Sequence, residues 1–150
     1  DCSTSNFCLS RTLARGGARA VHGLFAHPAN FITVLDFHTH PQQNPPVDVK
    51  RLGIFSDQDI ASFLSSGDRI IAAVISPDSI LMTVKTAATP RSASVQTLRS
   101  EIEEIRKRSC LLPPPASGIS FTKTACSRYA LALYIDKGCP AGQLRRVRLA

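Results

Sequence analysis

The stretch Phe31-Ile-Thr-Val-Leu-Asp-Phe37, followed at once by His38-Thr-His-Pro41, decides the fold class of this 150-residue chain. β-Branched and aromatic residues dominate its first seven positions, which predicts a β-strand with the histidines at its end. Alternate residues of a strand point to the same face, so the imidazoles of His38 and His40 can converge on one cation. A His-x-His pair also occurs for purely structural reasons, and alone it leaves both interpretations open.

A second polar motif opens the next predicted helix. Residues 42–54 are rich in Pro, Gln and Asn and predict a loop, after which Ser56-Asp-Gln-Asp59 precedes apolar residues at helical spacing. Gly67 ends this helix. Ser56 and Asp59 have the spacing of a capping box, so the pair taken alone is explained more simply as a helix cap than as a site.

The remaining chain predicts a hairpin, two helices and a short last strand. Residues 69–75 and 80–85 are two apolar runs around a Pro-Asp turn, which favours antiparallel strands. In residues 90–108 the apolar positions share one helical face, and Glu103 and Glu104 precede Lys107 and Arg108 by four residues. We expect Thr122 to cap a final helix through residues 129–133 that stops at Gly138, then a short strand within residues 145–149. A short first helix is expected from Ser10 through Leu13.

Together, the His-x-His-Pro strand, the Ser-x-x-Asp helix start and the hairpin resemble the JAMM (JAB/MPN, Mov34-type) zinc metallopeptidase motif over residues 31–85. The resemblance implies an α/β fold with a three-layer mixed β-sheet flanked by helices, similar to the cytidine-deaminase-like architecture. It implies Zn²⁺ held by His38, His40 and Asp59, and a catalytic Ser56 that hydrogen-bonds the zinc-bound water or the tetrahedral intermediate. The implied reaction is attack of that water on the amide of a protein or peptide substrate, with ubiquitin-like proteins among the candidates.

The chain departs from the family at its general acid/base. JAMM enzymes carry a glutamate upstream of the His-x-His strand, whereas the three glutamates here are Glu101, Glu103 and Glu104. Asp36 shares the strand face of His38 and could orient a histidine. We therefore expect residues 1–150 to form a single JAMM-like domain that lacks an N-terminal element. A catalytically inactive JAMM-like protein-interaction module is the alternative to a peptidase or isopeptidase.

Composition narrows the other function classes. A net charge of +7 favours anionic partners, but the basic residues are dispersed and the 2 Tyr and 7 Phe do not alternate with them. This pattern argues against nucleic-acid binding, although a basic binding domain without catalysis remains an alternative. Apolar runs fall short of the roughly 20 residues that span a bilayer, so no membrane association is expected. The sequence leaves open a cytoplasmic protein or a secreted effector.

The remaining histidines and the cysteines predict no second site. We interpret His22 and His27 as ordinary surface or turn residues. The five cysteines form no CxxC pair and predict buried or idle thiols rather than a zinc ribbon or a disulfide framework. A Cys2–Cys8 or Cys126–Cys139 bridge is left open. Metal-dependent hydrolase barrels that also use His-x-His need roughly 250 residues, which this chain does not supply.

Overall fold

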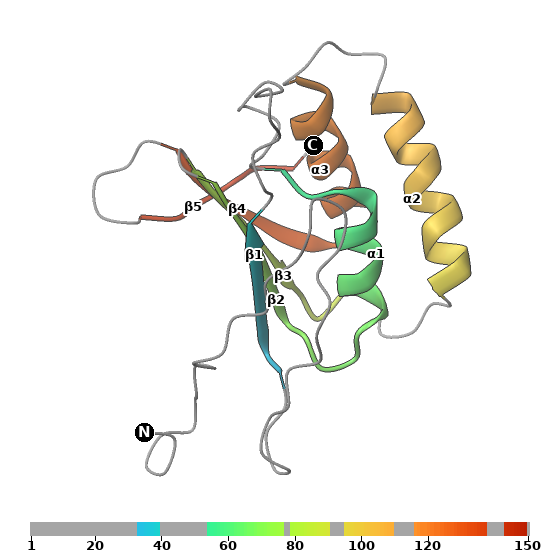
Figure 1. Cartoon of the computed structure of the whole chain (residues 1–150), viewed down its shortest axis with the longest axis horizontal. Helices are drawn as coiled ribbons and strands as arrows, with labels where there is room; N and C mark the ends of the chain where they lie inside the picture. Colours follow the sequence, from blue (N-terminus) through green and yellow to red (C-terminus); the bar gives the residue numbers. More distant parts are fainter. Residues whose placement is uncertain are drawn as a thin grey trace.

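A computed structural model of the chain describes residues 33–39, 54–76, 79–90, 95–109, 116–137 and 143–149 (Figure 1). These residues form a mixed α/β fold with five strands and three helices. The elements in chain order are β1 (Leu35–Thr39), α1 (Asp57–Ser65), β2 (Ile71–Ser76), β3 (Ser79–Lys85), α2 (Val95–Ser109), α3 (Ala116–Arg128), β4 (Leu131–Lys137) and β5 (Arg145–Arg146).

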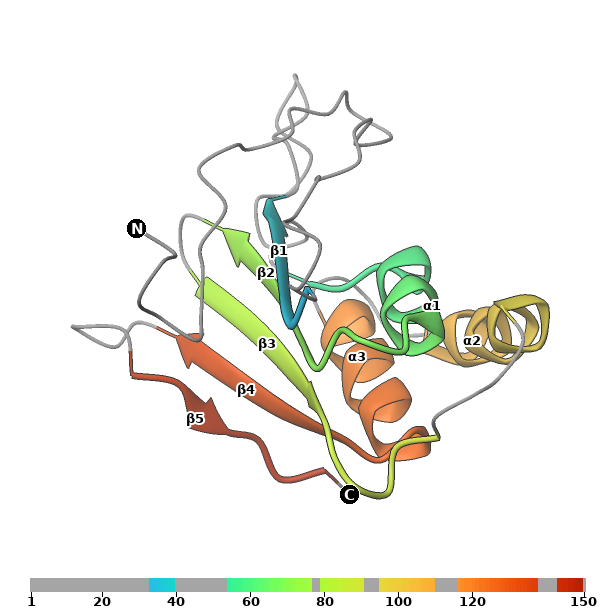
Figure 2. The same cartoon turned by 90° about the horizontal axis from the view of Figure 1, so that it is seen from below.

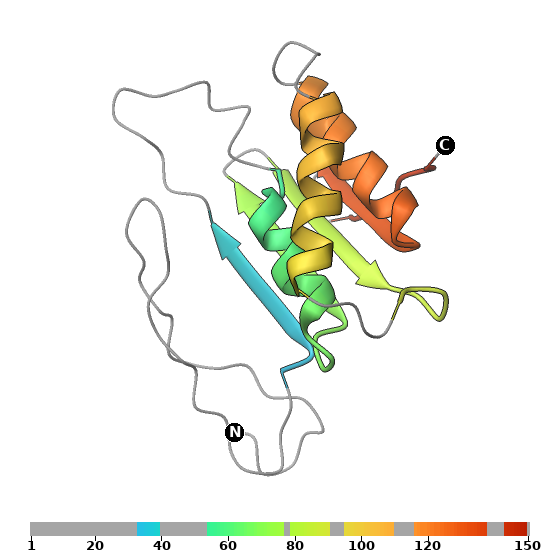
Figure 3. The same ribbon diagram turned by 90° about the vertical axis from the view of Figure 1, so that its right-hand side faces the viewer.

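The five strands form one sheet in the order β1-β2-β3-β4-β5. β1 is parallel to β2, and every other neighbouring pair is antiparallel. The expectation of an α/β fold with a mixed sheet is therefore confirmed. The three helices cover the same face of this sheet, with α2 packed outside α1 and α3 (Figures 2 and 3). Among the described residues no helix covers the other face of the sheet, so the expected three-layer arrangement is not established.

The predicted hairpin is confirmed as β2 and β3. Their register pairs Ile71 with Val84 and Ser76 with Ser79. At the turn, the Ser76 hydroxyl donates to the Ser79 carbonyl at 3.0 Å and accepts from the Ser79 amide at 3.1 Å. These local hydrogen bonds close the hairpin, as expected of a serine at a turn.

α1 and α2 also match their predictions, because each has a clear apolar face. In α1 the side chains of Ile60, Phe63 and Leu64 are buried in the core. The Lys85 ammonium group donates to the Ser66 carbonyl at the end of α1 and lies 4.9 Å from the centre of the Phe63 ring. That cation both satisfies a terminal carbonyl and favours the negative end of the helix dipole.

The core side of α2 consists of buried Leu98 and Ile102, with Ile105 partly buried against the same cluster. On its outer side Lys107 pairs with Glu103 at 3.6 Å and with Glu104 at 2.9 Å. The exposed pair of charges predicted at four-residue spacing is thus present for Glu103 and Lys107.

The prediction of a helix continuing through residues 129–133 is wrong. α3 ends at Arg128, Thr122 lies inside it rather than at its cap, and Ala130 adopts a left-handed conformation with φ 51°. Residues 131–137 instead form β4, which pairs with β3. Leu131, Ala132 and Leu133 are all buried, so this run is apolar on both sides and fits an interior strand better than an amphipathic helix.

The last predicted strand is confirmed in part. β5 covers only Arg145 and Arg146, although the Val147 amide extends the pairing by donating to the Leu133 carbonyl at 2.8 Å. Cys126 is a free, buried thiol, in agreement with the expected idle cysteines. None of the described helices combines the length and apolar character needed to cross a membrane.

Several predicted features lie outside the described residues. They are the first short helix, most of the loop of residues 42–54, and His22, His27, His40, Pro41, Cys2, Cys8, Cys110, Cys139 and the stop at Gly138.

Candidate metal site

The first side chains of the site come from β1. The predicted strand is confirmed as Leu35–Thr39, and His38 lies at its end, one residue before the last. Asp36 and His38 are half-buried on the side facing the helices, whereas Leu35 and Phe37 are exposed on the other side. An edge strand that turns two polar residues toward the core side needs partners for them there.

Those partners come from the amino end of α1. Ser56 is its N-cap, and the predicted capping box is complete. The Asp59 amide donates to the Ser56 hydroxyl oxygen at 3.1 Å, and the Ser56 amide donates to Asp59 Oδ2 at 2.7 Å. This arrangement satisfies two amides that would otherwise lack a partner at the start of the helix.

The cap and the strand meet through the second oxygen of the same carboxylate. His38 Nε2 lies 3.3 Å from Asp59 Oδ1, while Oδ2 serves the cap. The structure therefore brings together three of the four residues of the motif, His38, Ser56 and Asp59. The two interpretations of the Ser-x-x-Asp pattern are not exclusive, because Asp59 caps α1 and contacts the histidine at once.

The environment of His38 favours its charged form. Its hydrogen bond with Asp59 raises the pKa of His38 above 6.5, and the charges of Asp59 and Asp36 act in the same direction. Partial burial opposes this shift by penalising the charged imidazolium, but the net direction is upward. The same carboxylate that the resemblance assigns to zinc therefore favours a proton on His38, and a bound metal would compete with that proton.

Asp36, which we expected to orient a histidine, instead forms a hydrogen bond with an arginine. Arg69 Nη1 donates to Asp36 Oδ2 at 2.9 Å, so the carboxylate anchors an arginine and influences His38 only through its charge. Arg69 was not identified from the sequence. Its position just before β2, which is the parallel neighbour of β1, was the only signal for this contact.

A small pocket connects these groups. Its volume is about 60 Å³, enough for an ion and very few waters. The polar part of its wall carries two carboxylates, one imidazole and one guanidinium, and two phenylalanines form part of the apolar wall. The lining residues are Asp36, His38, Phe55, Asp59, Ser62, Phe63, Arg69 and Ala72.

The spacing of the two predicted ligands that the structure describes can be compared with that of a zinc site. Zn–N and Zn–O bonds of about 2.0–2.2 Å in a tetrahedral arrangement place two ligand atoms roughly 3.3–3.5 Å apart. His38 Nε2 and Asp59 Oδ1 have this separation, at 3.3 Å. Among the described residues, no three His, Cys, Asp or Glu side chains gather into a metal-binding group. The third predicted ligand, His40, is not among them.

Comparison with known proteins adds no relative. No protein-family model matches the chain, and no curated protein or solved structure is significantly similar to it. The metal site therefore depends on the motif and on the geometry of its described residues.

The three glutamates of the chain lie on α2 and are engaged there. Glu101 Oε2 accepts from the Tyr129 hydroxyl at 2.9 Å, and Glu103 and Glu104 pair with Lys107. These contacts are structural, because they link α2 to neighbouring residues. None of the three glutamates is therefore assigned as a general base beside His38.

Proposed function

We propose that this chain is a JAMM-like zinc-binding domain in which His38, His40 and Asp59 hold the ion. The observation that carries the proposal is the 3.3 Å separation of His38 Nε2 and Asp59 Oδ1. These atoms come from a strand and from a helix 21 positions later in the chain, and both face the same small pocket. The finer JAMM architecture is part of this proposal and is supported by the order β1, α1, β2, β3.

The reaction class that we propose is hydrolysis of an amide in a protein or peptide, including an isopeptide. When bound, zinc would lower the pKa of a coordinated water to about 7 and polarise a carbonyl group. His38 and Asp59 would bind the ion and fix its position, and the capping box fixes the Asp59 carboxylate relative to the helix. Ser56 Oγ accepts from the Asp59 amide, so its own proton is available for donation to an oxygen at the site.

The second candidate function is a metal-binding module that recognises a protein without cutting it. One observation favours it: Glu101, Glu103 and Glu104 are all engaged on α2. The two functions share the zinc site and differ only in turnover. They are therefore tested in two steps, first for the metal and then for cleavage.

Zinc binding is tested on the full chain, stripped with chelator and titrated with Zn²⁺ in a calorimeter, with elemental analysis of the loaded protein. We expect one zinc per chain and a loss of affinity of more than about 100-fold for His38→Ala and for His40→Ala. Asp57→Asn is the matched control, because Asp57 is in the same first turn but faces Arg106 at 3.7 Å. Absence of stoichiometric zinc, or unchanged affinity in folded His38→Ala, would refute the site.

Cleavage is tested with the zinc-loaded chain on a denatured protein, a peptide library and an isopeptide-linked ubiquitin-like substrate. Cuts that disappear in His38→Ala and persist in Asp57→Asn support the hydrolase. A chain that binds zinc stoichiometrically yet leaves every substrate uncut supports the binding module instead.

A further inference from the structure

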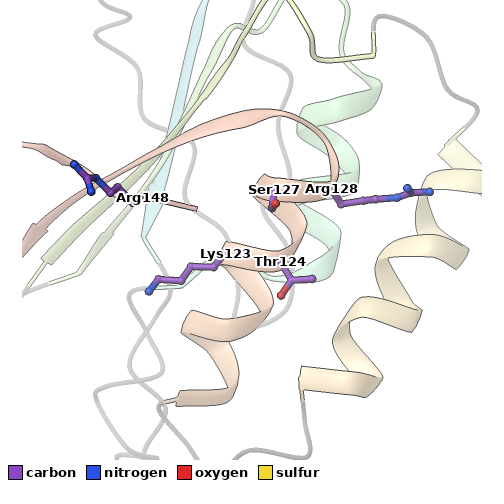
Figure 4. Close-up of a pocket in the computed structure, with 5 residues that line it drawn as sticks. All are labelled: Lys123, Thr124, Ser127, Arg128 and Arg148. Atoms are coloured by element: carbon purple, nitrogen blue, oxygen red, sulfur yellow. The ribbon is translucent and has the colours of Figure 1, made fainter. Parts of the chain in front are cut away.

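A second, larger pocket lies toward the opposite edge of the sheet, between α3 and the segment that follows β5. Its volume is about 360 Å³, and Figure 4 shows the residues that line it. We call this region the α3–β5 surface. It consists of Lys123, Thr124, Ser127, Arg128 and Arg148.

Core packing brings these residues together. Phe121, Ala125 and Cys126 turn one side of α3 into the core, which leaves the lining residues of this helix on its outer side. Beyond β5, Val147 bonds to β4 and packs with Leu149 against the core, which fixes the backbone around Arg148. The cations therefore stand on anchored elements from two distant parts of the sequence.

The positive charges of this surface are poorly neutralised. Neither α3 nor residues 143–149 contain an acidic residue, and Arg145 and Arg146, in the same segment as Arg148, are exposed as well. In the part of the chain that the structure describes, Lys123 and Arg148 have no carboxylate partner. Arg128 has only a long contact of 4.0 Å with Glu101, with 65% of its side chain exposed. Clustered cations that repel one another cost stability, so an anion outside these segments would relieve the cost.

The arrangement indicates the form of that anion. In Figure 4 Lys123 and Arg148 lie on one side of α3, whereas Arg128 extends in the other direction toward α2. A single phosphate cannot meet cations that point apart, but a chain of phosphates can pass from one to the next. Thr124 lies between them and offers a hydroxyl group of the kind that contacts phosphate oxygens.

We propose that the α3–β5 surface binds the phosphodiester backbone of a nucleic acid. The lining residues that the structure describes include no aromatic side chain on which bases could stack, so we expect binding to depend on charge and not on base sequence. The sequence alone argued against such a partner because its basic residues are dispersed. Folding places Lys123 of α3 beside Arg148, which lies 25 positions later in the chain. The proposal does not depend on zinc.

The test measures fluorescence anisotropy of labelled 20-nucleotide single-stranded RNA and DNA with the full chain, in chelator, between 50 and 200 mM NaCl. We expect affinity that falls steeply with salt, with a log–log slope of about −0.7 for each phosphate contacted. The double variant Lys123→Gln/Arg148→Gln should bind about 10-fold more weakly at 100 mM salt, with a slope shallower by about 1 to 1.5. Scrambling the base sequence should change the affinity by less than about 2-fold.

The matched control is Arg99→Gln/Arg108→Gln, which removes the same charge from exposed positions of α2. It should keep affinity within about 2-fold, since the charges removed lie outside the surface. If both double variants weakened binding equally, binding would depend on the net charge of the chain and not on this surface, which would overturn the proposal. So would no binding at 50 mM salt, release by millimolar inorganic phosphate at fixed ionic strength, or capture by phosphatidylserine vesicles but not by the oligonucleotides.

Discussion

The charged side chains at the two edges of the sheet differ in burial and in pairing. At the β1 edge, Asp36 pairs with Arg69 and His38 pairs with Asp59, and all four side chains are partly buried around a pocket of about 60 Å³. At the other edge, the cations of the α3–β5 surface are exposed and almost without carboxylates. Paired, half-buried charges hold elements of the fold in place, whereas exposed unpaired charges contribute little to stability. The nucleic-acid binding proposed above would give the exposed cations a role that is not structural.

The largest expected difference between the two edges is the loss in free energy of unfolding when one charged side chain is removed from each. In chelator, Asp59→Ala should lower the free energy of unfolding by about 2 kcal/mol, because the carboxylate's half of the capping box and its contact with His38 are both lost. Arg148→Ala should change it by less than about 0.5 kcal/mol. Urea unfolding followed by circular dichroism measures both. Equal costs at the two sites would contradict the division between a structural and a binding edge.

The features predicted correctly from the sequence are those encoded within a few residues. Ser56 and Asp59 lie three positions apart and cap α1 as expected, and the turn between β2 and β3 is closed by its own serines. The same reasoning gave a wrong prediction for residues 131–133, which were expected to be helical. They are buried on both sides of β4, and a run that is apolar on both sides carries no periodicity to separate strand from helix.

The candidate site was predictable as residue types and not as contacts. His38, Ser56 and Asp59 follow from the motif, but the pairing of Arg69 with Asp36 joins residues 33 positions apart. The same is true of Arg148 beside Lys123, which depends on the order of strands in the sheet. Long-range contacts of this kind follow from topology, and a single sequence gives no direct measure of topology.

The contrast between paired and unpaired polar groups can be sharpened inside the protein, with two threonines of opposite kind. Thr83 is fully buried at the centre of the sheet, and its hydroxyl has no hydrogen-bond partner among the described residues. Thr89 is also buried, but its hydroxyl donates to the Ala130 carbonyl at 3.1 Å and accepts from the Thr86 amide at 2.8 Å. Removing the two hydroxyls should therefore change the free energy of unfolding in opposite directions.

Thr83→Val should raise the free energy of unfolding by about 1 kcal/mol, because valine keeps the shape and removes an unsatisfied polar atom. Thr89→Val should lower it by about 1 kcal/mol or more, since the Thr86 amide loses its partner and the Ala130 carbonyl keeps only the Thr86 hydroxyl as a donor. Thermal and urea unfolding of the two variants beside the parent chain give the signs directly. A Thr83→Val protein less stable than the parent would mean that the hydroxyl has a partner.

The smallest expected effect concerns the proton on His38. The folded-state pKa of His38 lies above 6.5, so its contribution to stability is fully present below that pH and is lost as the pH rises through the raised pKa. In chelator, the free energy of unfolding of the parent chain minus that of His38→Gln should therefore decrease from mildly acidic toward alkaline pH. Zinc affinity should change in the opposite direction, because the metal competes with this proton and binds the neutral imidazole. A difference that stayed constant with pH would mean that the folded-state pKa of His38 is not raised and that its contact with Asp59 does not favour the proton.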